Sequence, residues 1–341
     1  MMRRRIILAS VMLALCVGCS GGADKETKES LQTQETEAVS EMDLHIETED
    51  ELLALYEQPV SDREAQLLEE CEMVMSDADL REDSKVLNFL VLITNEEEEE
   101  YYSDAKIDAM MILSLDKEER KMRLVSLERG MGVPMKIDGV ECQDDLMHCL
   151  SYGNEKVLLS TIENALKIDV NYYIRMNHFL LETLIDEFGG VNITLSEEEA
   201  KALNGEGISV SETSQTMTAG VNRMSGSDAL EYAFLHVTLD DTESTERQRN
   251  LVQAMIDAVG DVSVLRLKDT MLGLSYLVRK NIYRDDVFKL VTYAPAVLGK
   301  SFDQMNLPLE GSYGVTYSDR DTYIYAVDYM ENVKALHEFL Y

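Results

Sequence analysis

The chain has 341 residues, 45% of them hydrophobic, so it is long enough to bury one large domain with appendages or two small domains. Its formal net charge of −34 excludes binding to nucleic acid or to an anionic membrane by bulk electrostatics, because such partners would be repelled. This charge does not exclude a local basic pocket.

The N-terminus has the order of an export signal. A basic start at Arg3–Arg5 is followed by a short apolar run, Ile6–Val17. A small residue and then Cys19 follow, which resembles a bacterial lipobox with a lipidated cysteine, although Cys16 stands where Leu is usual. The alternative is an uncleaved membrane anchor, but the run is shorter than the ~20 residues that a spanning helix needs. We therefore expect residues 1–19 to be a lipoprotein-type signal peptide with Cys19 as the lipid anchor.

Two segments separate this signal from the first apolar run that is long enough for a strand. Residues 20–48 are mostly Gly, Ser, Thr, Gln, Glu and Lys, which cannot bury enough surface to fold. They are predicted to be a disordered tether. Residues 49–84 alternate acids with leucines, and Ser61 with Glu64 is typical of a capping box. This segment is predicted to be a helical extension packed on the main domain.

Strands and helices alternate in the predicted main domain, residues 85–262. The predicted strands are 86–93, 107–115, 122–127, 172–174 and 191–195, and the predicted helices are 155–166 and 179–188. The second helix is ended by Gly189-Gly190. This alternation predicts an α/β fold with a mixed central β-sheet flanked by helices, an α-β-α sandwich.

Three cysteines, an odd number, follow Cys19, so a full disulfide framework is not implied. Cys142 and Cys149 lie close to His148 in the sequence. They are either part of a metal site or buried small hydrophobic residues, and the second interpretation is favoured.

Two helix starts separated by an acidic loop are predicted towards the end of the main domain. Ser225 can cap the first helix, and Thr245 can cap the second in a capping box with Gln248. Arg247 would then lie in a first turn, where a cation opposes the helix dipole. Such a residue either grips an anion beside free backbone N–H groups or is a solvated surface arginine.

Residues 263–341 are predicted to be a C-terminal helical extension. Two amphipathic segments, Val262–Lys280 and Arg284–Leu298, begin it. A terminal strand, Tyr323–Val327, should pack on the main domain and lead into a helix, Tyr329–Leu340.

Four segments, in collinear order, resemble motifs of the LytR-CpsA-Psr family. Ile107–Ser114 is similar to the family's Arg-Ser-Asp-Thr strand, and Val125–Arg129 to its Ser-Ile-Pro-Arg-Asp strand end. Asp186–Val191 is similar to its Asp-x-x-Gly-Gly-Val turn, and Met224–Arg249 to its C-terminal signature.

The resemblance implies an exported phosphotransferase that attaches a polyprenyl-pyrophosphate-linked anionic glycopolymer to peptidoglycan. Its partners would be the lipid-linked glycan, peptidoglycan and, through the N-terminal lipid, the membrane; nucleic acid is not expected. Its place would be the extracellular face of the bacterial cytoplasmic membrane.

Site residues carry over position by position. The resemblance gives Asp108 and Glu96 as ligands of a Mg²⁺ or Mn²⁺ ion that holds the pyrophosphate, because hard cations prefer oxygen ligands. It gives Arg129 and Arg247 as catalytic residues that bind the pyrophosphate, and Asp241 as a catalytic carboxylate in the loop.

Other positions depart from the family pattern. Gly130 stands where the family has Asp, and Phe234 and His236 occupy the two positions of its Arg-x-Arg pair. Ser244 replaces the first arginine of Arg-x-x-Arg-Gln. Since positioned cations usually contribute the largest catalytic effect, these losses weaken the expectation of catalysis.

Arg175, Arg223 and Arg249 are candidates to replace the missing cations, although the sequence does not place them in the site. The alternative function is therefore a catalytically degenerate lipoprotein that binds lipid-linked cell-wall glycan without transferring it. A third class, an unrelated exported adhesin or solute-binding protein, is disfavoured by the collinear motifs.

Overall fold

The computed structural model describes residues 80–341, apart from 97–100, 103–104, 138–139, 154, 207–212, 236–240, 318–322 and scattered positions from 260 to 301. The predicted signal peptide with Cys19, the predicted tether and residues 49–79 of the predicted helical extension lie outside the described residues.

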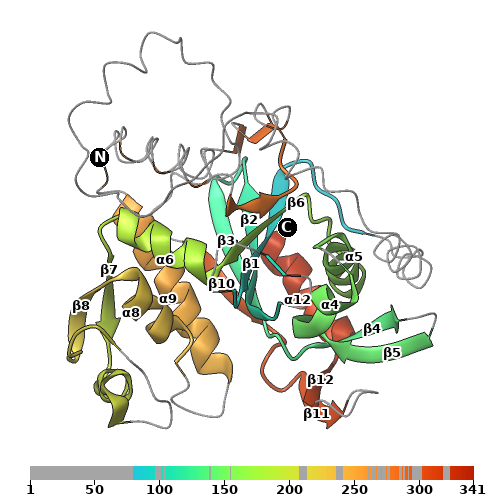
Figure 1. Ribbon diagram of the computed structural model, residues 1–341. Coiled ribbons are helices and arrows are strands. Elements are labelled where there is room, and N and C mark those ends of the chain that lie inside the picture. Colours follow the sequence, from blue (N-terminus) through green and yellow to red (C-terminus); the bar gives the residue numbers. More distant parts are fainter. Residues whose placement is uncertain are drawn as a thin grey trace.

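A six-stranded mixed sheet forms the centre of the fold, in the order β10-β3-β2-β1-β6-β9 (Figure 1). The strands are β1 (Val86–Thr94), β2 (Ile107–Asp116), β3 (Lys121–Leu127), β6 (Tyr172–Asn177), β9 (Arg279–Lys280) and β10 (Asp303–Leu307). β1 is parallel to β6, and β3 to β10, while β2 is antiparallel to both of its neighbours. The carboxyl ends of β1, β3, β6 and β10 therefore meet the amino end of β2 at one edge of the sheet.

Helices cover both faces of this sheet, which confirms the predicted α-β-α sandwich (Figure 1). One face packs against α6 (His178–Glu187), α8 (Gly226–Ala233) and α9 (Asp241–Val259). The other face packs against α4 (Cys149–Tyr152), α5 (Glu155–Leu166) and α12 (Tyr329–Leu340). Burial on both faces explains why β1 is a continuous apolar run and not an alternating one.

The remaining elements are small. They are β4 (Gly132–Ile137), β5 (Val140–Asp145), η2 (Leu146–His148), β7 (Val191–Leu195), α7 (Glu197–Lys201), η3 (Ala202–Glu206), β8 (Gly220–Met224), β11 (Tyr313–Tyr317) and β12 (Tyr323–Val327). Within the part of the chain that the structure describes, none of the helices combines the length and the hydropathy that a membrane crossing requires.

The predicted strands and helices of the main domain are confirmed, with shifts of a few residues at their ends. The predicted terminal strand and helix are confirmed as β12 and α12. β9 and β10 come from beyond residue 262 and are the two outermost strands of the central sheet. The predicted domain boundary at residue 262 therefore separates strands that belong to one sheet. Most of the predicted amphipathic segments between residues 262 and 298 lie outside the described residues.

The Gly-Gly turn after α6 has a clear physical reason. Gly189 and Gly190 have φ angles of 81° and 91°, a region that side chains rarely allow. A Cβ on Gly190 would also lie 2.4 Å from the carbonyl oxygen of Met224. Asp186 of the same motif accepts a hydrogen bond of 2.7 Å from the backbone N–H of Gly226. The motif therefore fixes α6 against β8 and the start of α8.

Of the two predicted helix starts, one is confirmed and one is wrong. The hydroxyl of Ser225 caps α8 by accepting a hydrogen bond from the backbone N–H of Asp228. By contrast, α9 begins at Asp241 and not after Thr245. The hydroxyl of Thr245 instead donates to the buried carboxylate of Glu128, 3.1 Å away. Arg247 consequently lies in the second turn of α9.

Candidate functional site

Three predicted site residues and one that was not predicted lie at the sheet edge where four strands end. Asp108 lies at the amino end of β2, and Arg129 lies just beyond the carboxyl end of β3. Glu96 follows β1, and His178 directly follows β6. The topology of the sheet, and not proximity in sequence, brings these four residues to one edge.

Asp108 contacts two basic side chains. Its Oδ1 lies 3.4 Å from Nη1 of Arg129, and its Oδ2 lies 3.0 Å from Nε2 of His178. The three side chains are 20%, 24% and 19% exposed, so each retains contact with solvent. The backbone carbonyl of Asp108 also accepts a hydrogen bond of 3.4 Å from Nε2 of Gln248, which anchors α9 at this edge. This group, Asp108 with Arg129 and His178, is the candidate site.

His178 was not among the predicted site residues. The residue begins α6, and its ring stacks on that of Phe234 at a centroid distance of 4.8 Å and an interplanar angle of 23°. Phe234 occupies a position where the resemblance leads one to expect arginine. The position of His178 between the predicted strand 172–174 and the predicted helix 179–188 was the available signal, because the carboxyl ends of strands are where α/β proteins place their sites.

Glu96, the other predicted metal ligand, belongs to a different group. Its Oε1 lies 2.6 Å from Nη2 of Arg175, whose Nη1 lies 2.8 Å from Oε1 of Glu155. Arg279 adds a second cation, 3.5 Å from the same oxygen of Glu155, and the ring of Tyr101 contacts both guanidinium groups. The side chains of Glu96 and Arg175 are only 2% exposed. This group, Glu96, Arg175, Glu155 and Arg279 with Tyr101, is called the buried cluster below.

Electrostatics within the buried cluster favour its charged state. Burial alone would raise the pKa of Glu155, but Arg175 and Arg279 outweigh that cost and hold the pKa below its usual value. Burial also raises the pKa of Tyr101, so its phenol stays protonated and donates to the carbonyl oxygens of Leu277 and Arg175.

The two predicted metal ligands differ in how well they fit a cation. Asp108 presents a partly exposed carboxylate, which suits a hard divalent ion that shares substrate oxygens. Glu96 does not fit in this arrangement, since its Oε1 is held by Arg175 and by the backbone N–H of Tyr102. Its Oε2 is buried and has no hydrogen-bond partner among the described residues. Glu96 would have to leave Arg175 to bind a metal beside Asp108.

The other predicted cations donate hydrogen bonds to protein groups outside the candidate site. Arg247 is 4% exposed, and its Nη2 donates to the carbonyl oxygen of Leu235. Of the candidate substitutes, Arg175 belongs to the buried cluster and Arg223 donates to the carbonyl oxygen of Gly189. Arg249 donates to Gln304, Ser126 and Asn306. The side chain of Asp241 and the whole of His236 lie outside the described residues.

A second group of possible metal ligands lies at the end of β5. Single ligand atoms of Asp144, Asp145 and His148 lie within 4.8 Å of one another. Nδ1 of His148 is 2.8 Å from Oδ1 of Asp145, and Asp144 accepts from the hydroxyl of Tyr152, so the carboxylates have protein partners. Cys149 is fully buried, in keeping with the favoured interpretation of this residue as a small hydrophobe.

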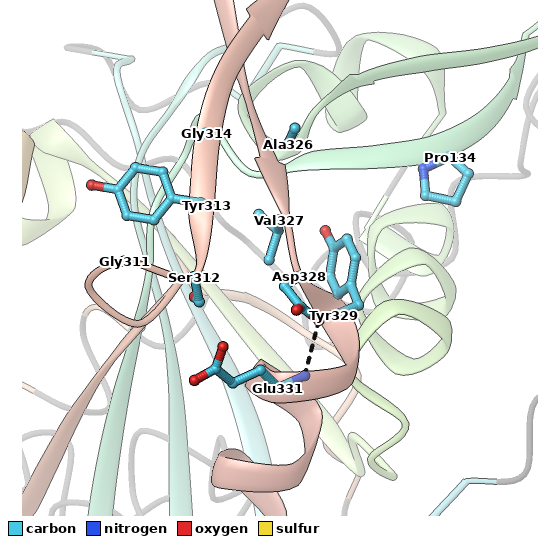
Figure 2. Close-up of a pocket in the computed structure, with 10 residues that line it drawn as sticks. All are labelled: Pro134, Gly311, Ser312, Tyr313, Gly314, Ala326, Val327, Asp328, Tyr329 and Glu331. Carbon is cyan, nitrogen blue, oxygen red and sulfur yellow. Dashed lines mark hydrogen bonds between the residues drawn. The ribbon is translucent and has the colours of Figure 1, made fainter.

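An open cavity of about 730 Å³ lies between the β11–β12 hairpin and the start of α12 (Figure 2). Its lining includes Tyr313, Val327, Tyr329 and Glu331. The hairpin is joined to the residue after Arg129, because the backbone N–H of Tyr325 donates to the carbonyl oxygen of Gly130 over 2.7 Å.

The chain matches a known protein family. The profile of the LytR_cpsA_psr family matches residues 52–337. The chain belongs to this family. The resemblance deduced from the four motifs is thereby confirmed, and the matched region includes every residue of the candidate site.

Curated relatives carry an enzymatic name. The polyisoprenyl-teichoic acid–peptidoglycan teichoic acid transferase TagU of Enterococcus faecalis is 24% identical over 196 residues, which are 57% of this chain and 60% of that protein. The chain thus covers less than two thirds of this relative's length. TagU of Halalkalibacterium halodurans is 24% identical over 66% of this chain and 70% of its own length.

Solved structures share the fold. The structure of TagT, a Bacillus subtilis protein, with bound octaprenyl pyrophosphate lipid has a TM-score of 0.54 and 18% identity. The alignment covers 76% of this chain and 91% of that one. At this level of identity the likeness establishes the fold and not the ligand.

Proposed function

We propose that this protein is a phosphotransferase that moves an anionic glycopolymer from a polyprenyl-pyrophosphate carrier to peptidoglycan. The observation that carries this proposal is the partly exposed contact between Asp108 and Arg129 at the sheet edge. A diphosphate needs bidentate or paired cationic donors, and a guanidinium at this position can supply them. The names of the curated relatives support the same reaction class.

The proposed step conserves every atom. A hydroxyl oxygen of peptidoglycan forms a bond to the phosphorus that carries the glycan, and its proton is released. The bond from that phosphorus to the bridging oxygen breaks, and polyprenyl phosphate leaves with this oxygen. Negative charge moves onto the leaving phosphate, where Arg129 would stabilise it.

A Mg²⁺ or Mn²⁺ ion is proposed to be held by Asp108 together with the substrate's own oxygens. Magnesium is commonly bound through one or two carboxylates and substrate phosphates, so a single exposed carboxylate is sufficient. When bound, such an ion would neutralise phosphate charge. Asp241 remains a predicted second carboxylate.

We place the protein at the extracellular face of the cytoplasmic membrane, anchored through lipid on Cys19. The support is the basic-apolar-cysteine order at the N-terminus and the cell-wall substrate named for the relatives. Metabolic labelling with a fatty-acid analogue should mark the wild type and not Cys19→Ala, and equal labelling of the two would refute the anchor.

One observation favours the second function, a lipoprotein that binds lipid-linked glycan without transferring it. Arg247 directs a donor to the carbonyl oxygen of Leu235 and is nearly fully buried. Arg129 would then be the single guanidinium, among the predicted catalytic ones, that reaches the substrate. Substrate binding alone does not accelerate a reaction, so a site that lacks positioned cations can bind a diphosphate without stabilising the transition state.

Transfer from a lipid-linked glycan to peptidoglycan oligomers, followed in vitro with the full-length chain, separates the two functions. We expect Asp108→Asn and Arg129→Ala each to lower the rate at least about a hundredfold, since each change removes electrostatic stabilisation of the transition state, through the metal ion in the first case and through the guanidinium in the second. Arg120→Ala is the matched control, because Arg120 lies in the exposed turn at the other end of β3. Turnover that survives both site changes would refute the site, whereas substrate binding without turnover in the wild type would favour the binding protein.

A further inference from the structure

His178 is the basic side chain that faces Arg129 across Asp108. One carboxylate oxygen of Asp108 contacts Arg129 and the other contacts His178, so the carboxylate stands between two basic groups. An anion that enters this group would meet donors on both sides.

The ring of His178 is held in place by its surroundings. Asn177 caps the start of α6 by accepting from the backbone N–H of Leu180, and the N–H of Phe179 donates to the carbonyl oxygen of Glu96. These two backbone donors are therefore already used within the protein, whereas Nε2 of His178 is buried and has no hydrogen-bond partner among the described residues. Stacking on Phe234 fixes the plane of the ring while 19% of the side chain stays exposed.

We propose that His178 donates a hydrogen bond to a phosphate oxygen of the lipid-linked pyrophosphate, opposite Arg129. This deepens the proposed function and rests on the same pyrophosphate site. Without substrate, Arg129 donates to the carboxylate of Asp108, whereas Nε2 of His178 lies 3.0 Å from that carboxylate without forming a hydrogen bond. When the diphosphate binds, the carboxylate would hold the divalent ion beside the substrate, and the two donors would pass to phosphate oxygens.

The aromatic partner of His178 explains why a histidine is proposed to bind phosphate here. Phe234, on which His178 stacks, stands where the family pattern has an arginine. A phenyl ring cannot bind phosphate, but it can orient an imidazole from the neighbouring helix. His178 would therefore supply, from α6, part of the binding that the absent arginine would have supplied from α8.

Calorimetry of the full-length chain in detergent, with inorganic pyrophosphate and with octaprenyl pyrophosphate as probes and Mg²⁺ present, tests the proposal. His178→Phe keeps an aromatic partner for Phe234 but removes the donor, so we expect its affinity for both probes to fall at least tenfold. His178→Gln keeps an N–H donor and should bind within about threefold of the wild type. Unfolding temperatures of all variants should stay within about 2 °C of the wild type.

His337→Phe is the matched control, because His337 lies in α12 on the opposite face of the sheet and contacts the carbonyl oxygens of Leu166 and Lys167. Its pyrophosphate affinity should not change. Wild-type affinity in a folded His178→Phe protein would overturn the proposal, and so would equal losses in the Phe and Gln variants. A wild type that binds pyrophosphate through His178 but transfers nothing would remove the transferase assignment and leave this inference standing.

Discussion

Two groups of arginine and carboxylate side chains lie at the same edge of the sheet and differ in burial. The buried cluster has two carboxylates, Glu96 and Glu155, balanced by two guanidinium groups, and its central side chains are 2% exposed. The candidate site has one carboxylate, Asp108, between two basic groups, and its side chains are about one fifth exposed. Similar residue types therefore lie in different surroundings: the first group is buried and paired within itself, and the second is partly open to solvent.

The difference follows from where each arginine lies along its strand. Arg175 lies within β6, beneath Tyr101 and beside β9, so neighbouring segments cover it. Arg129 lies beyond the end of β3, beside the amino end of β2, and its side chain is 24% exposed. A buried arginine must be neutralised by its own protein, since an unpaired buried charge costs several kcal/mol. A partly exposed arginine at the end of a strand, by contrast, can contact a substrate.

The largest effect should come from breaking the buried cluster. Arg175→Met removes the cation that Glu96 and Glu155 share and leaves both carboxylates buried. We expect the free energy of unfolding to fall by about 3–5 kcal/mol, the usual cost of removing one partner of a buried ion pair. Denaturant unfolding of the full-length chain measures this loss.

Arg129→Met is the paired control for that measurement, because it removes an equal charge from the partly exposed site. Its cost should stay below about 1 kcal/mol, as is usual for ion pairs in contact with solvent. If both variants lost a similar free energy of unfolding, the difference in burial between the two groups would not affect stability.

The sequence predicted the frame of the molecule well because its signals are local. The apolar run of β1 and the spacing of apolar residues in α5 are direct consequences of burial, and both elements lie where they were predicted. The Gly-Gly turn was predictable for a similar reason, since positive φ angles restrict the choice of residue. The start of α9 was not predictable, because Thr245 is engaged by Glu128, 117 positions away in the sequence.

Side-chain partners within the site were the least predictable feature. The motif resemblance gave both Asp108 and Arg129 as site residues, and in the structure their side chains are in contact. It could not tell that Glu96 would pair with Arg175, because an ion pair between two strands leaves no local pattern. His178 was missed for the converse reason: it matches no motif, and only the parallel pairing of β1 and β6 brings it to the edge where Asp108 lies.

The smallest expected effect is that of Glu96→Gln on Mg²⁺-dependent binding. Compared with Asp108→Asn, it shows which of the two carboxylates holds a metal ion. Asp108→Asn should abolish the dependence of pyrophosphate binding on Mg²⁺, since an amide is a far weaker ligand for a hard cation than a carboxylate. Glu96→Gln should change the Mg²⁺-dependent affinity by no more than about twofold, because Glu96 is buried and Arg175 keeps its contact with Glu155. Titration of each folded variant with pyrophosphate, with and without Mg²⁺, measures both effects. If Glu96→Gln lost the Mg²⁺ dependence as fully as Asp108→Asn, Glu96 would have to leave Arg175 when substrate binds, and the buried cluster would then be part of the site.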